Sequence, residues 1–208
     1  MTDKPIIFSA PMIRALLEGR KTQTRRITRK QDWPAGVVAL HPHQHGAGWA
    51  VGDRLWVREA WRTFVSLNDL APVDLWPRDC KGVGIAYEAG GGMSITASGE
   101  RRVDYALEPR DDMPAFGRLR AAMHMPRWAS RLTLTVSEVR VQRLQDITDD
   151  DAKAEGVKPQ HGAGEPHVAA YADLWAELHG STSWSGNPFV AALTFTVERR
   201  NIDAAEAT

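Results

Sequence analysis

The sequence contains only one cysteine, Cys80, among 208 residues. A lone cysteine cannot form a disulfide within the chain, so the fold depends on its core, and a reducing, cytoplasmic compartment is expected. The sequence also lacks an apolar run of about 18 residues, the length that a membrane-spanning helix needs. Its first residues, Met1–Pro5, lack the basic and apolar regions of a secretory signal. We therefore expect a cytoplasmic protein without a membrane partner.

The chain has no net charge, because 26 basic residues balance 26 acidic ones. The two signs are nevertheless unevenly distributed. Residues 1–30 carry a net charge of +6, and residues 146–155 carry a net charge of −4. A basic stretch attracts phosphate, which favours a nucleotide or nucleic-acid partner. The alternative interpretation is that both stretches are solvated faces with no partner.

Two further patterns fall short of a functional site. His41, His43 and His45 alternate along the chain, but zinc needs firmly held ligands and this stretch is rich in glycine and proline. Gly90–Gly92 lacks the Gly-Lys-Ser/Thr ending of a phosphate-binding loop. We therefore expect neither a metal nor another cofactor.

Hydrophobic residues make up 43% of the chain and charged residues 25%, as in ordinary globular proteins. Patterns of period 2 and period 3.6 predict strands and helices along the chain. The predicted strands are Ile6–Phe8, Lys21–Ile27, Leu55–Glu59, Arg131–Leu144 and Phe189–Val197. The predicted helices begin after Ser9, after Thr148 and before Val168, with Ser9 and Thr148 as N-caps. They indicate one α+β domain over residues 1–208 with mostly antiparallel strands. We expect an irregular excursion at about 62–125, with short strands near 85–87 and 103–107.

The segment Gly19–Arg26 gathers hydroxyl, amine and guanidinium groups directly after a predicted helix. In an extended chain, alternation would place Lys21 and Thr24 on opposite faces unless a turn or bulge intervenes near Gln23. From the residue types alone, phosphate binding is the leading functional hypothesis for this segment, and a plain charged sheet edge is the alternative.

This segment resembles the signature of the ASCH family, written Gly-x-Lys-x-x-Glu-x-Arg. It matches at Gly19, Lys21 and Arg26, and it has Thr24 where many relatives have glutamate. Threonine at this position is a feature of the small ASCH amidohydrolases that deacetylate N4-acetylcytidine. The resemblance, which covers about residues 4–60 and 125–198, implies a PUA-like β-barrel with helices packed over a cleft.

Other segments extend this resemblance. Those similar to ASCH proteins, including a phage- and prophage-associated branch, are Gly52–Val57, Met125–Arg131, Ile147–Gly156 and Asn187–Phe189. The third of them is similar to a helix that carries a catalytic glutamate in the amidohydrolases. That glutamate corresponds to Glu155 in this chain.

The resemblance implies a catalytic site made of Lys21, Thr24 and Glu155. Lys21 could act as a base if burial and the neighbouring Arg25 or Arg26 lowered its pKa. Glu155 would orient Lys21 and relay a proton, while Thr24 or a water bound to it attacked the acyl carbon. Arg26 or a backbone N–H would stabilise the oxyanion.

Two other functions stay open from the sequence. An RNA-binding module without catalysis would stack a base on Trp56 or Trp61. Its phosphate contacts would be Lys21, Arg25, Arg26, Arg29 and Lys30. Ribonuclease activity is a third possible function. It is harder to argue from this sequence, because no histidine belongs to the signature. The expected partner is therefore a nucleoside or RNA, and the oligomeric state is open. The expected substrate-binding residues are Arg25, Arg26 and Trp56.

Overall fold

The computed structural model describes most of the chain in two compact units. The described residues are 2–29, 31, 48–75, 82–96, 98, 100–105, 116–159 and 164–204. The first unit comprises Met1–Asp3, Ala15–Arg54 and Leu134–Val197, and the second comprises Lys4–Arg14, Leu55–Thr133 and Glu198–Thr208. The histidines at 41, 43 and 45 and the cysteine at 80 lie outside the described residues. The single domain over residues 1–208 stays a prediction.

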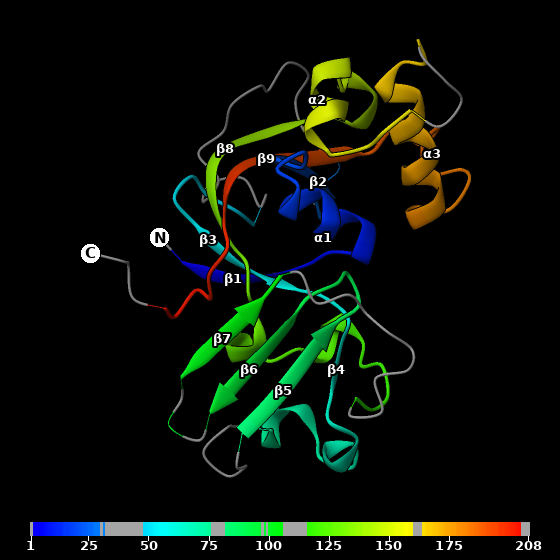
Figure 1. The fold of residues 1–208 in the computed structure, drawn as a ribbon. Coiled ribbons are helices and arrows are strands. Elements are labelled where there is room, and N and C mark those ends of the chain that lie inside the picture. Colours follow the sequence, from blue (N-terminus) through cyan, green and yellow to red (C-terminus); the bar gives the residue numbers. More distant parts are fainter. Residues whose placement is uncertain are drawn as a thin grey trace. The chain divides into compact units, whose positions relative to one another are not determined.

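Within the described residues, the strands form two sheets (Figure 1). The first has the order β1 (Asp3–Ile7), β3 (Arg54–Arg58), β8 (Thr133–Arg143), β9 (Phe189–Glu198) and β2 (Gln23–Ile27). The second has the order β4 (Trp61–Thr63), β5 (Gly82–Tyr87), β6 (Gly92–Thr96) and β7 (Arg101–Asp104). The α+β class is confirmed. The predicted barrel is not found, because both sheets are open within the described residues.

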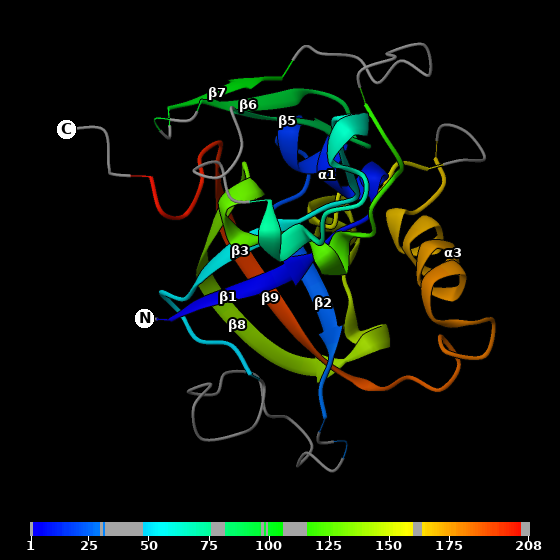
Figure 2. The same cartoon turned by 90° about the horizontal axis from the view of Figure 1, so that it is seen from below.

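The long strands of the first sheet hold the N-terminal signature in place. Figure 2 shows β8 and β9 running side by side. β2 pairs antiparallel with β9, so that Gln23 lies opposite Thr194 and Ile27 lies opposite Val190. This pairing places the segment after Gly19 against a buried strand rather than on a free loop.

The helices of the described residues are α1 (Ala10–Leu17), α2 (Asp149–Ala154) and α3 (His167–His179). Short 3-10 turns are η1 (Val65–Leu67), η2 (Pro72–Asp74), η3 (Ala122–His124), η4 (Arg127–Ala129) and η5 (Leu144–Asp146). The predicted cap of α2 is confirmed, because Asp151 N donates to Thr148 Oγ1 at 3.1 Å. In the part of the chain that the structure describes, no helix is long and apolar enough to cross a membrane.

The second sheet lies where the sequence predicted irregular structure. An irregular excursion was expected at about 62–125, but β4–β7 form a regular antiparallel meander there. The pattern is hard to see in the sequence because glycines occupy strand positions. Gly84 is one of them, and a Cβ on it would collide with the ring of Phe64. The absence of a side chain therefore leaves room for an aromatic ring against the sheet.

The core of the second unit encloses an ion pair. Its apolar members are Trp61, Leu75, Val83, Ile85, Tyr87, Met93, Ile95, Met125, Trp128 and Ala129. Arg131 is buried, and its Nε and Nη2 donate to the two carboxylate oxygens of Glu59 at 2.9 and 2.8 Å. Its guanidinium carbon also lies 4.0 Å from the centroid of the Tyr87 ring. Burial raises the pKa of Glu59, and Arg131 opposes that rise.

Candidate functional site

The two stretches of opposite charge meet in the first unit. Lys21 Nζ donates to Glu155 Oε2 at 2.8 Å and to the Glu155 backbone carbonyl at 3.0 Å. The two side chains are only 1% and 3% exposed. The lysine of the signature and the glutamate after α2 are therefore direct partners in the interior.

The backbone after α2 explains how these partners come so close. Gly156 has a φ of +84°, and a Cβ on it would lie 2.9 Å from the Cβ of Ala15 and 3.0 Å from that of Lys21. Beside it, Thr22 N donates to the carbonyl of Ala154 at 2.8 Å. Glycine is needed at this position, both for the left-handed turn and for the close approach of the two segments.

Arg25 completes the buried cluster. Its Nη1 donates to Glu155 Oε1 at 3.0 Å, and its Nη2 donates to Asp151 Oδ2 at 2.9 Å. Asp151 Oδ1 accepts from Arg140 Nη2 at 2.7 Å and from Gln23 Nε2 at 3.2 Å. The Glu155 carboxylate is thus shared between two cations, with one oxygen for each.

The environment of Lys21 lowers its pKa below the ordinary value of 10.5. Burial is the largest cause, because the interior disfavours the charged ammonium. Glu155 opposes this shift, and the positive charges of Arg26 and Arg25 add to it. The amine therefore loses its proton more readily than an exposed lysine does, as a general base requires.

Tyr171 of helix α3 lies against this cluster. Tyr171 is buried, and its ring centroid lies 5.8 Å from the guanidinium carbon of Arg25. Burial, and then the charge of Glu155, raise the pKa of Tyr171 well above its ordinary value. The phenol therefore stays protonated, which leaves Lys21 and Glu155 as the candidate proton carriers of the cluster.

Thr24 lies in β2, opposite Leu193 of β9, and it is buried. Strand alternation turns its side chain to the face opposite that of Gln23 and Arg25. In the described part of the chain, the hydrogen bonds and ion pairs do not link Thr24 with Lys21 or Glu155. The structure therefore joins Lys21 and Glu155 of the predicted trio. Thr24 lies in β2, outside this contact.

Comparisons of the chain with protein-family models, with curated proteins and with solved structures give no match. The resemblance to ASCH proteins thus rests on the sequence motifs. Within the described residues, no group of three histidine, cysteine, aspartate or glutamate side chains could hold a metal ion.

The predicted substrate-binding residues differ in their surroundings. Arg26 is partly exposed, and burial lowers its pKa while Glu155 opposes the shift. Arg25 is buried and engaged by carboxylates, so its guanidinium is not available to an external phosphate. Trp56, in the second unit, is 6% exposed with Arg58 over its ring, and Trp61 is 0% exposed. Base stacking needs an open ring face, so the burial of both rings does not favour it, and stacking there stays a prediction.

Sequence reasoning missed the supporting side chains of the cluster. Asp151 was seen only as part of an acidic stretch, and Gln23 only as a strand residue. The one available signal was charge complementarity between residues 1–30 and 146–155. Arg140 and Tyr171 had no comparable signal, because only the fold brings β8 and α3 to this cluster.

Proposed function

We propose that the chain is an amidohydrolase that removes an acyl group from a modified nucleobase or nucleoside such as N4-acetylcytidine. The proposal includes a PUA-like fold of the ASCH type. The buried contact between Lys21 and Glu155 carries it, because the motif comparison singles out these two residues and the fold joins them at 2.8 Å. A lysine whose pKa is lowered next to a proton-relaying carboxylate suits general-base catalysis.

The proposed reaction begins with the uncharged amine of Lys21. It takes a proton from a water bound to Thr24, or from the Thr24 hydroxyl once a local shift of the segment before β2 brings it within reach, as the oxygen bonds to the acyl carbon. The carbonyl oxygen becomes an oxyanion. When the oxyanion collapses, the C–N bond breaks, and the departing amine takes the proton from Lys21 through Glu155. If Thr24 is the nucleophile, a water then hydrolyses the acyl-threonine ester.

Arg25 has a positioning role in this scheme. A carboxylate beside Lys21 by itself would hold the ammonium form and weaken the base. Because Glu155 Oε1 is engaged by Arg25 Nη1 at 3.0 Å, the carboxylate stays paired when Lys21 becomes neutral. Arg25 therefore offsets part of the cost of burying this carboxylate while Lys21 is neutral.

The partly exposed Arg26 is the member of the signature that is suited to meet substrate. It would stabilise the oxyanion or an acyl oxygen by a charge-assisted hydrogen bond. Lys21, Thr24 and Glu155 are buried, so a neighbouring side chain must move before substrate reaches them. The same burial lowers the pKa of Lys21, which links reactivity of the base to restricted access.

The test is release of cytidine and acetate from N4-acetylcytidine by the full chain. Glu155→Gln should lower turnover by ~10²–10⁴, the scale of one acid–base group. Glu177→Gln, which changes an exposed carboxylate of α3, is the matched control and should retain full activity. Wild-type activity that Glu155→Gln also retains would remove the proposed chemistry from this site.

Measurements of RNA binding separate this function from the alternatives. A binding module, with or without ribonuclease activity, would bind RNA more weakly as the salt concentration rises. For each neutralised phosphate, the logarithm of the binding constant would fall by about 0.7 for every tenfold increase in salt. The internal pairing of Lys21 and Arg25 withdraws two of the basic side chains that this model uses. Salt-sensitive RNA binding without hydrolysis of any acylated nucleoside would favour the binding module.

A further inference from the structure

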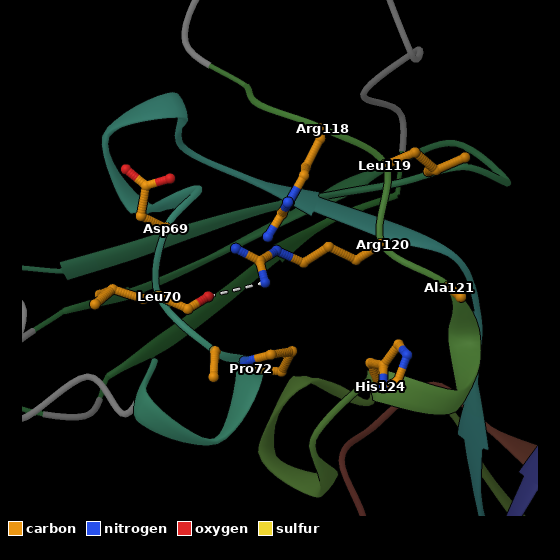
Figure 3. A pocket seen from close by; sticks show the side chains of 9 residues that line it. Asp69, Leu70, Pro72, Arg118, Leu119, Arg120, Ala121 and His124 are labelled. Carbon is orange, nitrogen blue, oxygen red and sulfur yellow. Dashed lines mark hydrogen bonds between the residues drawn. The ribbon is translucent and has the colours of Figure 1, made fainter.

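The second unit contains a pocket of about 520 Å³ that plays no part in the proposed hydrolysis (Figure 3). Asp69–Pro72 line one side of it, and Arg118–Ala121 together with His124 line the other. Its volume lies within the range of ~300–1,000 Å³ that is usual for small-molecule sites. The lining includes two arginines, which indicate the kind of ligand that the pocket accepts.

Arg120 is fixed in the wall of this pocket. Its Nη1 donates to the Leu70 carbonyl at 3.0 Å, and its Nη2 donates to the carbonyls of Leu67 and Asn68 at 2.9 and 3.2 Å. Its guanidinium carbon also lies 5.5 Å from the centroid of the Trp61 ring. All these partners are neutral, and the buried Nε has no hydrogen-bond partner. The positive charge of Arg120 is therefore oriented by its neighbours but not neutralised by them.

Arg118 brings a second positive charge to the same place. It is held by Asn68, whose Oδ1 accepts from the Arg118 backbone N–H at 3.1 Å and whose carbonyl accepts from Nη2 at 2.9 Å. Figure 3 shows the Arg118 side chain extending toward that of Arg120. Burial, and then the charge of Arg118, lower the pKa of Arg120. The two guanidiniums are thus close enough to repel each other.

Among the residues that the structure describes, no ion pair relieves this repulsion. Within the described residues, neither Arg118 nor Arg120 takes part in an ion pair, although the Asp69 carboxylate lines the same pocket. Two neighbouring arginines that lack a counter-charge form a site for an anion with two or more acceptor oxygens. A phosphomonoester fits this site better than a carboxylate does, since it carries a charge of about −1.5 to −2 near pH 7.

The rim of the pocket is apolar. Leu70 is 38% exposed and Leu119 is 45% exposed, and both belong to the lining. Exposed leucines beside a cationic wall suit a ligand that combines a charged group with an apolar or aromatic part. A bare inorganic anion would leave this rim in contact with water.

We infer that this pocket binds a small phosphomonoester, with its phosphate at Arg118 and Arg120 and its apolar or aromatic part against Leu70 and Leu119. Arg118 supplies the adaptable contact, because it is exposed, whereas Arg120 supplies a fixed one. This inference does not rest on the proposed hydrolase function, since none of the residues that line the pocket belongs to the Lys21 cluster.

Calorimetric titration with phenyl phosphate tests the inference on the full chain. Phenyl phosphate should bind more tightly than inorganic phosphate, and phenol should bind more weakly than phenyl phosphate. Arg118→Gln should weaken phenyl phosphate binding about tenfold or more, as expected for one lost charge-assisted hydrogen bond. Arg102→Gln, an exposed arginine of β7 in the same unit, is the matched control and should leave binding unchanged.

A second variant tests the apolar contact. Leu119→Ser should weaken binding of phenyl phosphate while leaving inorganic phosphate unaffected. Thermal melting of each variant checks that the protein remains folded. Glu155→Gln, which alters the Lys21 cluster, should bind phenyl phosphate like the wild type. The inference is overturned if phenyl phosphate does not bind the wild type, or if Arg118→Gln and Arg102→Gln weaken the binding of phenyl phosphate equally.

Discussion

Lys21 and Glu155 stand 134 residues apart in the sequence, and their Nζ and Oε2 atoms lie 2.8 Å apart in the interior of the first unit. Their contact belongs to a larger pairing of opposite charges, in which Arg25 holds both Glu155 and Asp151. Part of the positive charge of the basic N-terminal stretch is therefore paired with carboxylates of the protein itself. This pairing favours an internal proton-transfer site over an open phosphate-binding surface.

A pair of substitutions at Thr24 tests whether its hydroxyl takes part in the reaction. Thr24→Ala should lower hydrolysis of N4-acetylcytidine by ~10²–10⁴. Thr24→Ser keeps a hydroxyl at the same position and should retain most of the turnover. Steady-state rates of both variants, with melting temperatures as the folding control, decide the matter. Equal activity of the alanine variant and the wild type would exclude both forms of nucleophile assigned to Thr24.

The lowered pKa of Lys21 predicts how hydrolysis depends on pH. The base is the uncharged amine, so kcat/KM should rise as pH increases and level off below pH 10.5, the ordinary pKa of lysine. Lys21→Arg keeps the positive charge but cannot lose its proton, and should abolish this rise together with most of the activity. Rates measured across this pH range provide the check. A wild-type profile that keeps rising through pH 10.5 would contradict a lowered pKa.

Two glycine substitutions separate backbone strain from the close approach at the site. Gly156→Ala and Gly48→Ala each place a side chain at a similar positive φ, +84° and +82°, which costs about 1–2 kcal/mol. The Cβ on Gly48 would meet no atom within 4 Å, whereas that on Gly156 would press on Lys21. Urea unfolding should show a larger loss of stability for Gly156→Ala, and only that variant should lose hydrolytic activity. Equal losses in both variants would show that the contact with Lys21 is unimportant.

The ion pair in the second unit predicts a strong effect on stability. Arg131→Met leaves the buried Glu59 carboxylate without its partner and should destabilise the protein by about 3–5 kcal/mol at neutral pH. The loss should shrink as pH falls, because Glu59 then takes up a proton and no longer carries a buried charge. Chemical unfolding at several pH values measures both effects. Adding Glu59→Leu to Arg131→Met should recover part of the stability, and a double variant as unstable as the single one would contradict this account.

The sequence alone predicted the elements whose patterns are local. Alternation over Arg131–Leu144 and Phe189–Val197 predicted β8 and β9, which run over Thr133–Arg143 and Phe189–Glu198. The Thr148 cap was predicted from the residue and its neighbours. Each of these signals depends on side chains within a few positions of one another, so no knowledge of the tertiary fold is needed to read them.

Lys21 and Glu155 were named together only through the resemblance to ASCH proteins, and their contact depends on the fold. The left-handed turn at Gly156 and the pairing of β2 with β9 bring the two segments together. The tertiary structure likewise decided that Arg25 faces carboxylates rather than solvent, and that Trp56 is covered. It also placed Arg118 and Arg120 beside the turn at Asp69. Partners so far apart along the chain leave no periodic signal, because their proximity results from the packing of separate elements.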